Sequence, residues 1–197
     1  MKKSIWITLV AVVIIMVGCS AFKNASQMLN CKYSYNSISG IKVAGIDFSN
    51  ITAASLITAI PQITKIIQGN FSDLPFELTV NVNVMNPSTT KTAALSDMRY
   101  QMAIDNIDVA SGNLGRKFSV EPGKTNVLPV VVKTNLGNLL NAQNRSQVVQ
   151  IVKNFTGISG EESTIKMKVK PVLVTKSGTN LTMPEVPLSF KYSGKKK

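Results

Sequence analysis

The chain has 197 residues, enough for one domain or two small ones. Hydrophobic residues make up 44% and charged residues 16%, a balance that excludes a disordered polyelectrolyte. The sequence contains no histidine and only two cysteines, Cys19 and Cys31. It therefore excludes His-based catalytic triads, His-ligated metal sites and four-cysteine zinc sites.

The N-terminus has the layout of a secretory signal peptide. Lys2 and Lys3 precede an apolar run over residues 5–17, which is shorter than the roughly 20 residues that a transmembrane helix needs. The tetrapeptide Met16-Val17-Gly18-Cys19 then resembles the lipobox of bacterial lipoproteins. This resemblance implies that residues 1–18 are removed and that Cys19 carries a diacylglyceryl thioether and an acyl chain such as palmitate. An uncleaved signal anchor is the alternative interpretation.

The segment 19–30 is predicted to be a short tether between this lipid and the folded part. It contains no acidic residue, and the first one after Cys19 is Asp47. Some Bacteroidetes-type lipoproteins carry an acidic cluster there that directs surface display. We therefore expect a lipid-anchored protein of the bacterial cell envelope that faces the periplasm.

Cys31 is the only thiol that remains once Cys19 is lipidated, so an intramolecular disulfide is excluded. We expect Cys31 to be a small buried apolar residue and the protein to be a monomer. An intermolecular disulfide is the alternative.

The folded part, residues 31–192, is predicted to be a single domain. A strand over 40–49, with a bulge near Gly45, precedes a segment of helical period over 51–69 that Pro61 should break or kink. The strongest strand pattern lies in Phe76–Val84, where apolar residues alternate with polar ones up to the turn at Asn86-Pro87. Further strands are predicted over 98–104, 109–112, 118–120 and 127–133.

The C-terminal part begins with a helical period over 136–155, which a polar middle divides into what could be two short helices. Residues 165–174 and 181–192 are then predicted to form a hairpin, parts of which Pro171, Pro184 and Pro187 place at a sheet edge. Seven or eight strands with two helical insertions predict an antiparallel β-sandwich of the fibronectin type III or immunoglobulin-like kind. Residues 193–197 form a basic tail.

The order of these motifs resembles a known family. The motifs are Val80 to Pro87, the strand with Tyr100 and Ile104, Val109-Ala110-Ser111-Gly112, Val120 to Thr125, and Leu128 to Val132. They are similar to the second group of late embryogenesis abundant (LEA) proteins, also called the water-stress and hypersensitive-response domain. The resemblance is best over residues 76–135. It implies a fibronectin-like sandwich and a role in stress tolerance, and it brings no catalytic residues.

The formal charge is +12, or +10 without Lys2 and Lys3. Lys166, Lys168 and Lys170 alternate and should line one face of a strand. We interpret them as a solvated face; contact with an anionic membrane surface is the alternative. No basic run is interleaved with aromatic residues, so no nucleic-acid partner is expected.

An enzyme is not expected either. Asp105 with Asp108 and Glu161 with Glu162 are loop acids, and the Ser-x-x-Lys pattern of Ser163 and Lys166 lacks its usual helix. No metal or cofactor site is predicted. The leading hypothesis is a non-enzymatic, membrane-anchored envelope lipoprotein that acts as a scaffold or binding module for an unknown protein or lipid. A glycan- or lipid-binding lipoprotein is the alternative, although the only tryptophan lies in the signal peptide.

Overall fold

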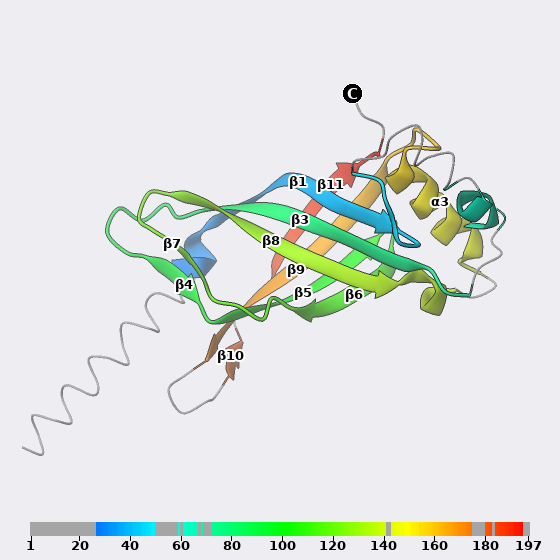
Figure 1. Cartoon of the computed structure of the whole chain (residues 1–197). Helices are drawn as coiled ribbons and strands as arrows, with labels where there is room; N and C mark the ends of the chain where they lie inside the picture. The colour runs from blue at the N-terminus through cyan, green and yellow to red at the C-terminus, as the bar shows by residue number, and fades with distance from the viewer. Residues whose placement is uncertain are drawn as a thin grey trace, which may run out of the picture.

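The computed structural model describes residues 27–49, 59, 61–66, 68, 72–140, 143–174, 180–182 and 184–194. They form an antiparallel β-sandwich, as the sequence predicted (Figure 1). The front sheet has the strand order β2-β1-β3-β8, and the back sheet has the order β10-β9-β5-β6 with β11 also paired to β9. A small sheet of β4 and β7 lies at one end. The strands are β1 Lys32–Val43, β2 Ile46–Asp47, β3 Pro75–Met85, β4 Ala93–Leu95, β5 Asp97–Ile104, β6 Ile107–Asn113, β7 Phe118–Val120, β8 Thr125–Asn135, β9 Ser163–Val174, β10 Asn180–Thr182 and β11 Val186–Tyr192.

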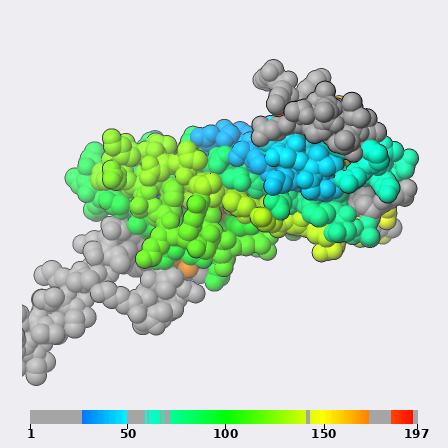
Figure 2. Space-filling model, viewed as in Figure 1, coloured from blue at the N-terminus to red at the C-terminus, as the bar shows by residue number. Residues whose placement is uncertain are grey.

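Strand β3 is the centre of the front sheet, between β1 and β8. Its alternation is the predicted one, with every second side chain at most 1% exposed: Phe76, Leu78, Val80, Val82 and Val84. The same period in β5 buries Met98, Tyr100, Met102 and Ile104 against them. Figure 2 shows β1 and β8 along the upper part of this side, with green atoms of the β5–β6 region exposed below them.

The first strand differs from the prediction in two ways. It begins at Lys32 rather than at residue 40, and Gly45 lies in a turn rather than in a bulge. Ala44 and Gly45 have φ angles of 51° and 79° and connect β1 to β2, because a two-residue hairpin of this twist needs positive φ at both positions. The register of β1 against β3 shifts instead at two places, between Tyr35 and Ser37 and around Gly40, between Ser39 and Lys42.

The segment 19–30, predicted as a tether, lies within the described residues from Gln27 onward. Residues 27–30 are helical, and the side chain of Met28 is fully buried in the core. The folded part therefore includes the end of that segment. Residues 1–26, with the predicted signal peptide and Cys19, lie outside the described residues.

The helical insertions lie at the end of the sandwich opposite β4 and β7 (Figure 1). The period over 136–155 forms two elements, a 3-10 helix η1 Leu136–Leu139 and the helix α3 Arg145–Thr156. From α3, the Phe155 ring packs edge-on against Phe76, with centroids 5.3 Å apart, and contacts Tyr192 at 5.0 Å. In the predicted segment 51–69, residues 59 and 61–66 are helical, and most of the others lie outside the described residues.

Side-chain contacts join the two sheets along both long sides of the sandwich. On one side, Tyr35 of β1 stacks on Phe190 of β11 at 4.3 Å. On the other side, the Tyr100 hydroxyl donates to the Val131 carbonyl of β8 at 3.2 Å. A β-carbon on Gly112 would lie 2.9 Å from the Tyr100 hydroxyl oxygen, so glycine at this position makes room for the tyrosine ring. Arg116 donates to the carbonyl of Pro129 in β8 at 2.8 Å.

Pro171 does not lie in an edge strand, contrary to the prediction, because β9 has neighbours on both sides. The Val172 carbonyl accepts from Ser96 beside β5, so the nitrogen of Pro171 faces the opposite side of the strand. There the ladder with β11 ends opposite Val169, and the ladder with β10 begins at Val172. Pro171 therefore lies between the β11 and β10 pairings, where no neighbouring strand needs the backbone N–H that proline lacks. Pro187, in contrast, lies in β11, which pairs only with β9 among the described strands.

No helix among the described residues is long and apolar enough to cross a membrane.

Candidate functional site

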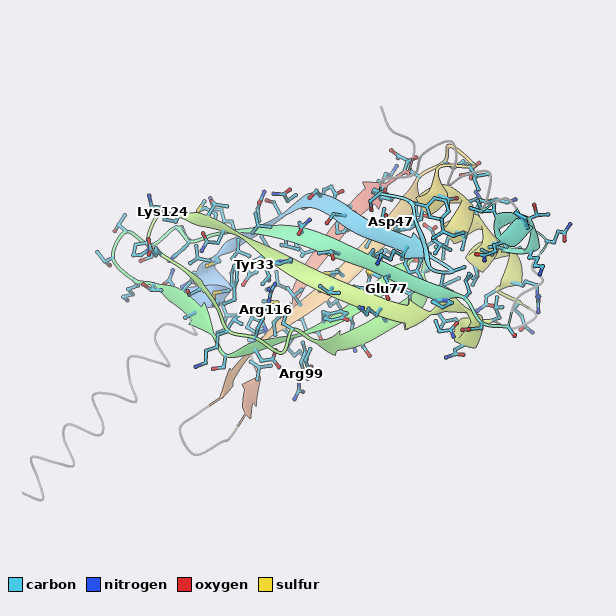
Figure 3. All side chains as sticks on the ribbon, in the orientation of Figure 1. Tyr33, Asp47, Glu77, Arg99, Arg116 and Lys124 are labelled. Atoms are coloured by element: carbon cyan, nitrogen blue, oxygen red, sulfur yellow. The ribbon has the colours of Figure 1, made fainter. Side chains whose placement is uncertain are left out.

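Four cations lie together on the outer surface of the back sheet, on the adjacent strands β9 and β5. A further one, Lys191 of β11, is paired with Glu162. Lys166, Lys168 and Lys170 of β9 point outward because Ile165, Met167 and Val169 between them are buried. Arg99 of β5 lies directly opposite Lys170 in the strand pairing. We call Arg99, Lys166, Lys168 and Lys170 the basic face. Figure 3 shows Arg99 directed away from the sandwich.

One carboxylate partly neutralises the basic face. Glu185, in the segment before β11, contacts Lys170 at 3.0 Å and Lys168 at 3.7 Å. The hydrogen bond from Lys170, with the charge of that lysine and of Lys168, holds the pKa of Glu185 below its usual value. Lys166 donates to the neutral amide oxygen of Asn106 at 2.9 Å. Among the described residues no carboxylate pairs with Arg99, so a net positive charge remains on the face.

The basic face is hollowed rather than flat. Arg99, Lys168, Lys170 and Glu185 line a hollow of about 160 Å³. A second hollow of about 320 Å³ lies further along β9, beside Lys166 and Lys168. Gln101, which faces outward opposite Lys168, lines both. Cationic walls around small open hollows can receive anionic groups such as phosphates.

The end of the sandwich near the basic face is organised around a buried amide. Asn86, which ends the predicted strand, is fully buried. Its Nδ2 donates to the carbonyls of Lys91 and Val120, and its Oδ1 accepts from Gln27 Nε2 and from the Ser88 N–H. The Asn-Pro turn thus connects the beginning of the described chain to β7. The sequence indicated a turn here but not the burial of its side chain.

The candidate catalytic residues are not brought together. Ser163 is fully buried and accepts a hydrogen bond from Asn154, whereas Lys166 lies on the opposite, exposed face of β9. The two therefore cannot form a Ser–Lys dyad in this arrangement. Asp105 accepts from the Thr164 N–H at 2.7 Å and so holds the turn between β5 and β6 against β9.

Two of the other predicted loop acids are paired. Glu161 accepts from Gln150 at 2.8 Å, and Glu162 lies 3.6 Å from Lys191. Asp108 is exposed on β6 and lines the second hollow. Among the described residues no group of three or more Cys, Asp or Glu side chains could hold a metal ion.

Cys31 is buried, 7% exposed, and its Sγ lies 3.5 Å from the Gln27 carbonyl. Burial raises the pKa of its thiol to about 11. Of the remaining predicted sites, Cys19 and the tail Lys195–Lys197 lie outside the described residues. The sequence alone does not assign Arg99 and Glu185 to the lysine face. The pairing of β5 with β9 places Arg99 beside Lys170, and the pairing of β11 with β9 brings Glu185 to Lys168 and Lys170.

No protein-family model matches the sequence, and no curated protein matches it. Solved structures do match the chain. A protein from Archaeoglobus fulgidus has 13% identity over 83% of this chain and all of its own, with a TM-score of 0.38. The At1g01470 protein of Arabidopsis thaliana has 10% identity over 82% of this chain and 80% of its own, with a TM-score of 0.45.

A third match is described as a late embryogenesis abundant protein. This protein, At2g46140.1, has 14% identity over 94% of this chain and 86% of its own, with a TM-score of 0.41. The fold is shown by the strands and their pairing, whereas a place in the LEA family stays a prediction from the sequence motifs.

Proposed function

We propose that the protein is a non-enzymatic envelope lipoprotein, anchored by lipid on Cys19, whose β-sandwich acts as a binding module. The observation that carries the proposal is the Gly18-Cys19 boundary after an apolar run, followed within eight residues by a folded domain at Gln27. The role as a binding module draws on the chemistry of the described residues. Buried or turn polar groups such as Asp105, Asn154 and Ser163 are used in structural hydrogen bonds, whereas the cations of β9 face outward.

A stress-related role is the finer part of the proposal and draws on the LEA-like motifs between residues 76 and 135. Of the two alternative ligands, the basic face favours an anionic lipid over a glycan. Sugar-binding platforms usually rest on tryptophan and tyrosine faces, and the chain after residue 18 contains no tryptophan.

Lipidation is tested by expressing wild type and Cys19→Ala in a bacterial host fed with labelled palmitate. We expect wild type to carry the label and to fractionate with membranes, and Cys19→Ala to lose both the label and the processing at residue 19. A Cys31→Ala variant is the matched control and should behave as wild type does. Equal labelling and membrane retention of Cys19→Ala would contradict the proposed anchor.

The expected orientation is tested in the same cells. Protease added outside should spare the protein in intact cells and digest it once the outer membrane is opened. Digestion in intact cells would indicate surface display instead.

A further inference from the structure

We propose that the basic face of the back sheet docks on an anionic membrane surface. The first argument is the arrangement of charge. Like charges opposite each other in a sheet destabilise it, and Arg99 lies opposite Lys170, with two more lysines on the same face of β9. Four cations share Glu185 as their one paired carboxylate among the described residues. An anionic layer of lipid headgroups relieves this repulsion.

The second argument is shape. The hollow between Arg99, Lys168 and Lys170, about 160 Å³, is open to solvent and has room for a phosphate-sized headgroup. The neighbouring hollow beside Lys166 offers about 320 Å³. Among the outward neighbours, Ser111 on β6 and Pro187 and Ser189 on β11 are uncharged, and Lys191 on β11 is paired with Glu162. Asp108 on β6 places one carboxylate beside the second hollow, so the hollow at Arg99, Lys168 and Lys170 is the one that suits an anionic headgroup.

The third argument is position, and it rests on the proposed lipid on Cys19. Gln27 contacts Asn86, which bonds to Val120 of β7, and β7 pairs with β4 two residues before β5 begins. Arg99 and Lys170 therefore lie toward the end of the sandwich at which the described chain starts. Gln27 comes eight positions after Cys19, so the chain between them can reach at most about 26–29 Å. A lipid on Cys19 keeps the basic face near headgroups at a high effective concentration, which a soluble acidic partner lacks.

The test uses the chain that starts at Ser20, so that neither lipid nor signal peptide contributes to binding. The core of the described residues begins at Met28, so this chain keeps it whole. Its binding to vesicles of phosphatidylcholine alone and of phosphatidylcholine with 30% phosphatidylglycerol is measured by co-sedimentation. We expect binding only to the anionic vesicles, weakened as salt rises, because screening shortens the range of the attraction.

Two charge variants assign this binding to the face. Arg99→Gln/Lys170→Gln should bind roughly 25-fold more weakly, since each cation near an anionic bilayer is worth roughly a fivefold change. The matched control, Lys42→Gln/Lys65→Gln, removes two exposed lysines at the α3 end and should stay within about twofold of wild type. Equal losses in the two pairs would overturn the assignment.

A third variant is expected to gain vesicle binding rather than lose it. Glu185→Gln removes the carboxylate that pairs with Lys168 and Lys170, and it should strengthen vesicle binding by roughly fivefold. A misfolded protein would not show a salt-dependent gain of this kind. Unchanged or weaker binding of Glu185→Gln would contradict the proposal.

The docking proposal and the lipid anchor can fail separately. Lipid on Cys19 together with no preference of the Ser20 chain for anionic vesicles would overturn docking and leave the anchor. Preference for anionic vesicles, lost in Arg99→Gln/Lys170→Gln, without lipid on Cys19 would overturn the anchor and leave docking. A chain that bound a soluble polyanion but ignored the vesicles would also overturn docking on a membrane.

Discussion

The side chain of Asn86 joins three segments that are far apart in the sequence. It contacts Gln27 at the start of the described chain, the Lys91 carbonyl in the loop before β4, and the Val120 carbonyl at the end of β7. An amide can do this because it donates two hydrogen bonds and accepts others from one planar group. Because Asn86 is fully buried, a donor or acceptor that lost its partner here would have no water to bond to, and the folded state would be destabilised.

Asn86→Asp tests this role with almost no change of shape. A carboxylate cannot donate to the two carbonyls, so we expect the free energy of unfolding at pH 7 to fall by about 2–4 kcal/mol. The loss should shrink at low pH, where the neutral acid regains one donor. Asn126→Asp removes an exposed amide donor to the Ser119 carbonyl and should cost less than about 1 kcal/mol. Similar urea midpoints for the two variants would contradict the prediction.

Cys31 should be chemically inert in the folded chain. Its pKa is raised by burial from 9.0 to about 11, so near pH 8 the thiolate fraction falls about 100-fold. Ellman's reagent should therefore react at least that much more slowly with native than with urea-unfolded chain, and a non-reducing gel should show monomer. A dominant dimer that reductant dissolves would contradict this.

The raised pKa of Cys31 also makes the free energy of unfolding depend on pH. A raised pKa means that the folded state keeps its proton where the unfolded state has lost it. The stabilisation is fully present below about pH 9 and is lost as pH rises toward about 11. The urea midpoint should therefore fall as pH rises from about 9 to 11, and Cys31→Ala should make this fall smaller. The rest of the fall should remain, because burial also raises the pKa of several tyrosines.

At the scale of elements, β3 is the strand on which the front sheet depends. It pairs along its whole length with β8 and along most of it with β1, and one of its faces is buried throughout. Asn81, on the other face, donates to Ser37 and Ser39 of β1 at 3.1 Å. The two faces of one strand therefore contribute by different means, apolar burial and partly exposed hydrogen bonds.

Val82→Ala should lower the free energy of unfolding by about 1–3 kcal/mol, because it leaves a cavity in a fully packed core. Asn81→Thr should cost about 0.5 kcal/mol or less, since its site is partly solvated and threonine favours strands. Urea midpoints of both variants measure this. An equal or larger loss at Asn81 would mean that the outer face matters as much as the core.

The sequence predicted the strands with strict alternation, β3 and β5, but not the first half of β1. Residues 32–39 contain serines, an asparagine and tyrosines without a clear period. None of them is fully buried, so this half of the strand does not need apolar residues at alternate positions, and the sequence carries no strand signal there. The basic face was half predicted. The three lysines share a face through their spacing alone, whereas Arg99 joins them through the order of strands, which depends on contacts distant in sequence.

At the scale of the whole molecule, the sandwich is closed on its two sides and at both ends. Tyr35 with Phe190 and Tyr100 with Val131 close the sides. The small sheet of β4 and β7 covers one end and α3 the other, where Phe155 meets Phe76 of β3 (Figure 1). The helical insertion is therefore part of the one core.

A double-mutant cycle tests whether α3 and the sheets unfold together. Phe155→Leu and Phe76→Leu should each destabilise the chain. The double mutant should lose about 0.5–1.5 kcal/mol less than the sum of the two single losses, because either substitution alone already removes the edge-to-face contact. Unfolding followed by helix and by tyrosine signals should coincide. Additive losses, or a helix signal that disappears first, would show that α3 is an independent cap.

The edge of β8, which pairs only with β3 among the described strands, has a consequence for the proposed membrane anchor. Val127 and Val131 are about half exposed there, a composition that invites edge-to-edge aggregation between copies. Between them Pro129 offers no N–H, and its carbonyl is occupied by Arg116, while the Val131 carbonyl is taken by Tyr100. Proteins held by lipid in two dimensions meet far more often than in solution, and this edge gives an approaching strand few groups to pair with. With the proposed lipid on Cys19, a dense layer of these molecules would therefore stay fluid.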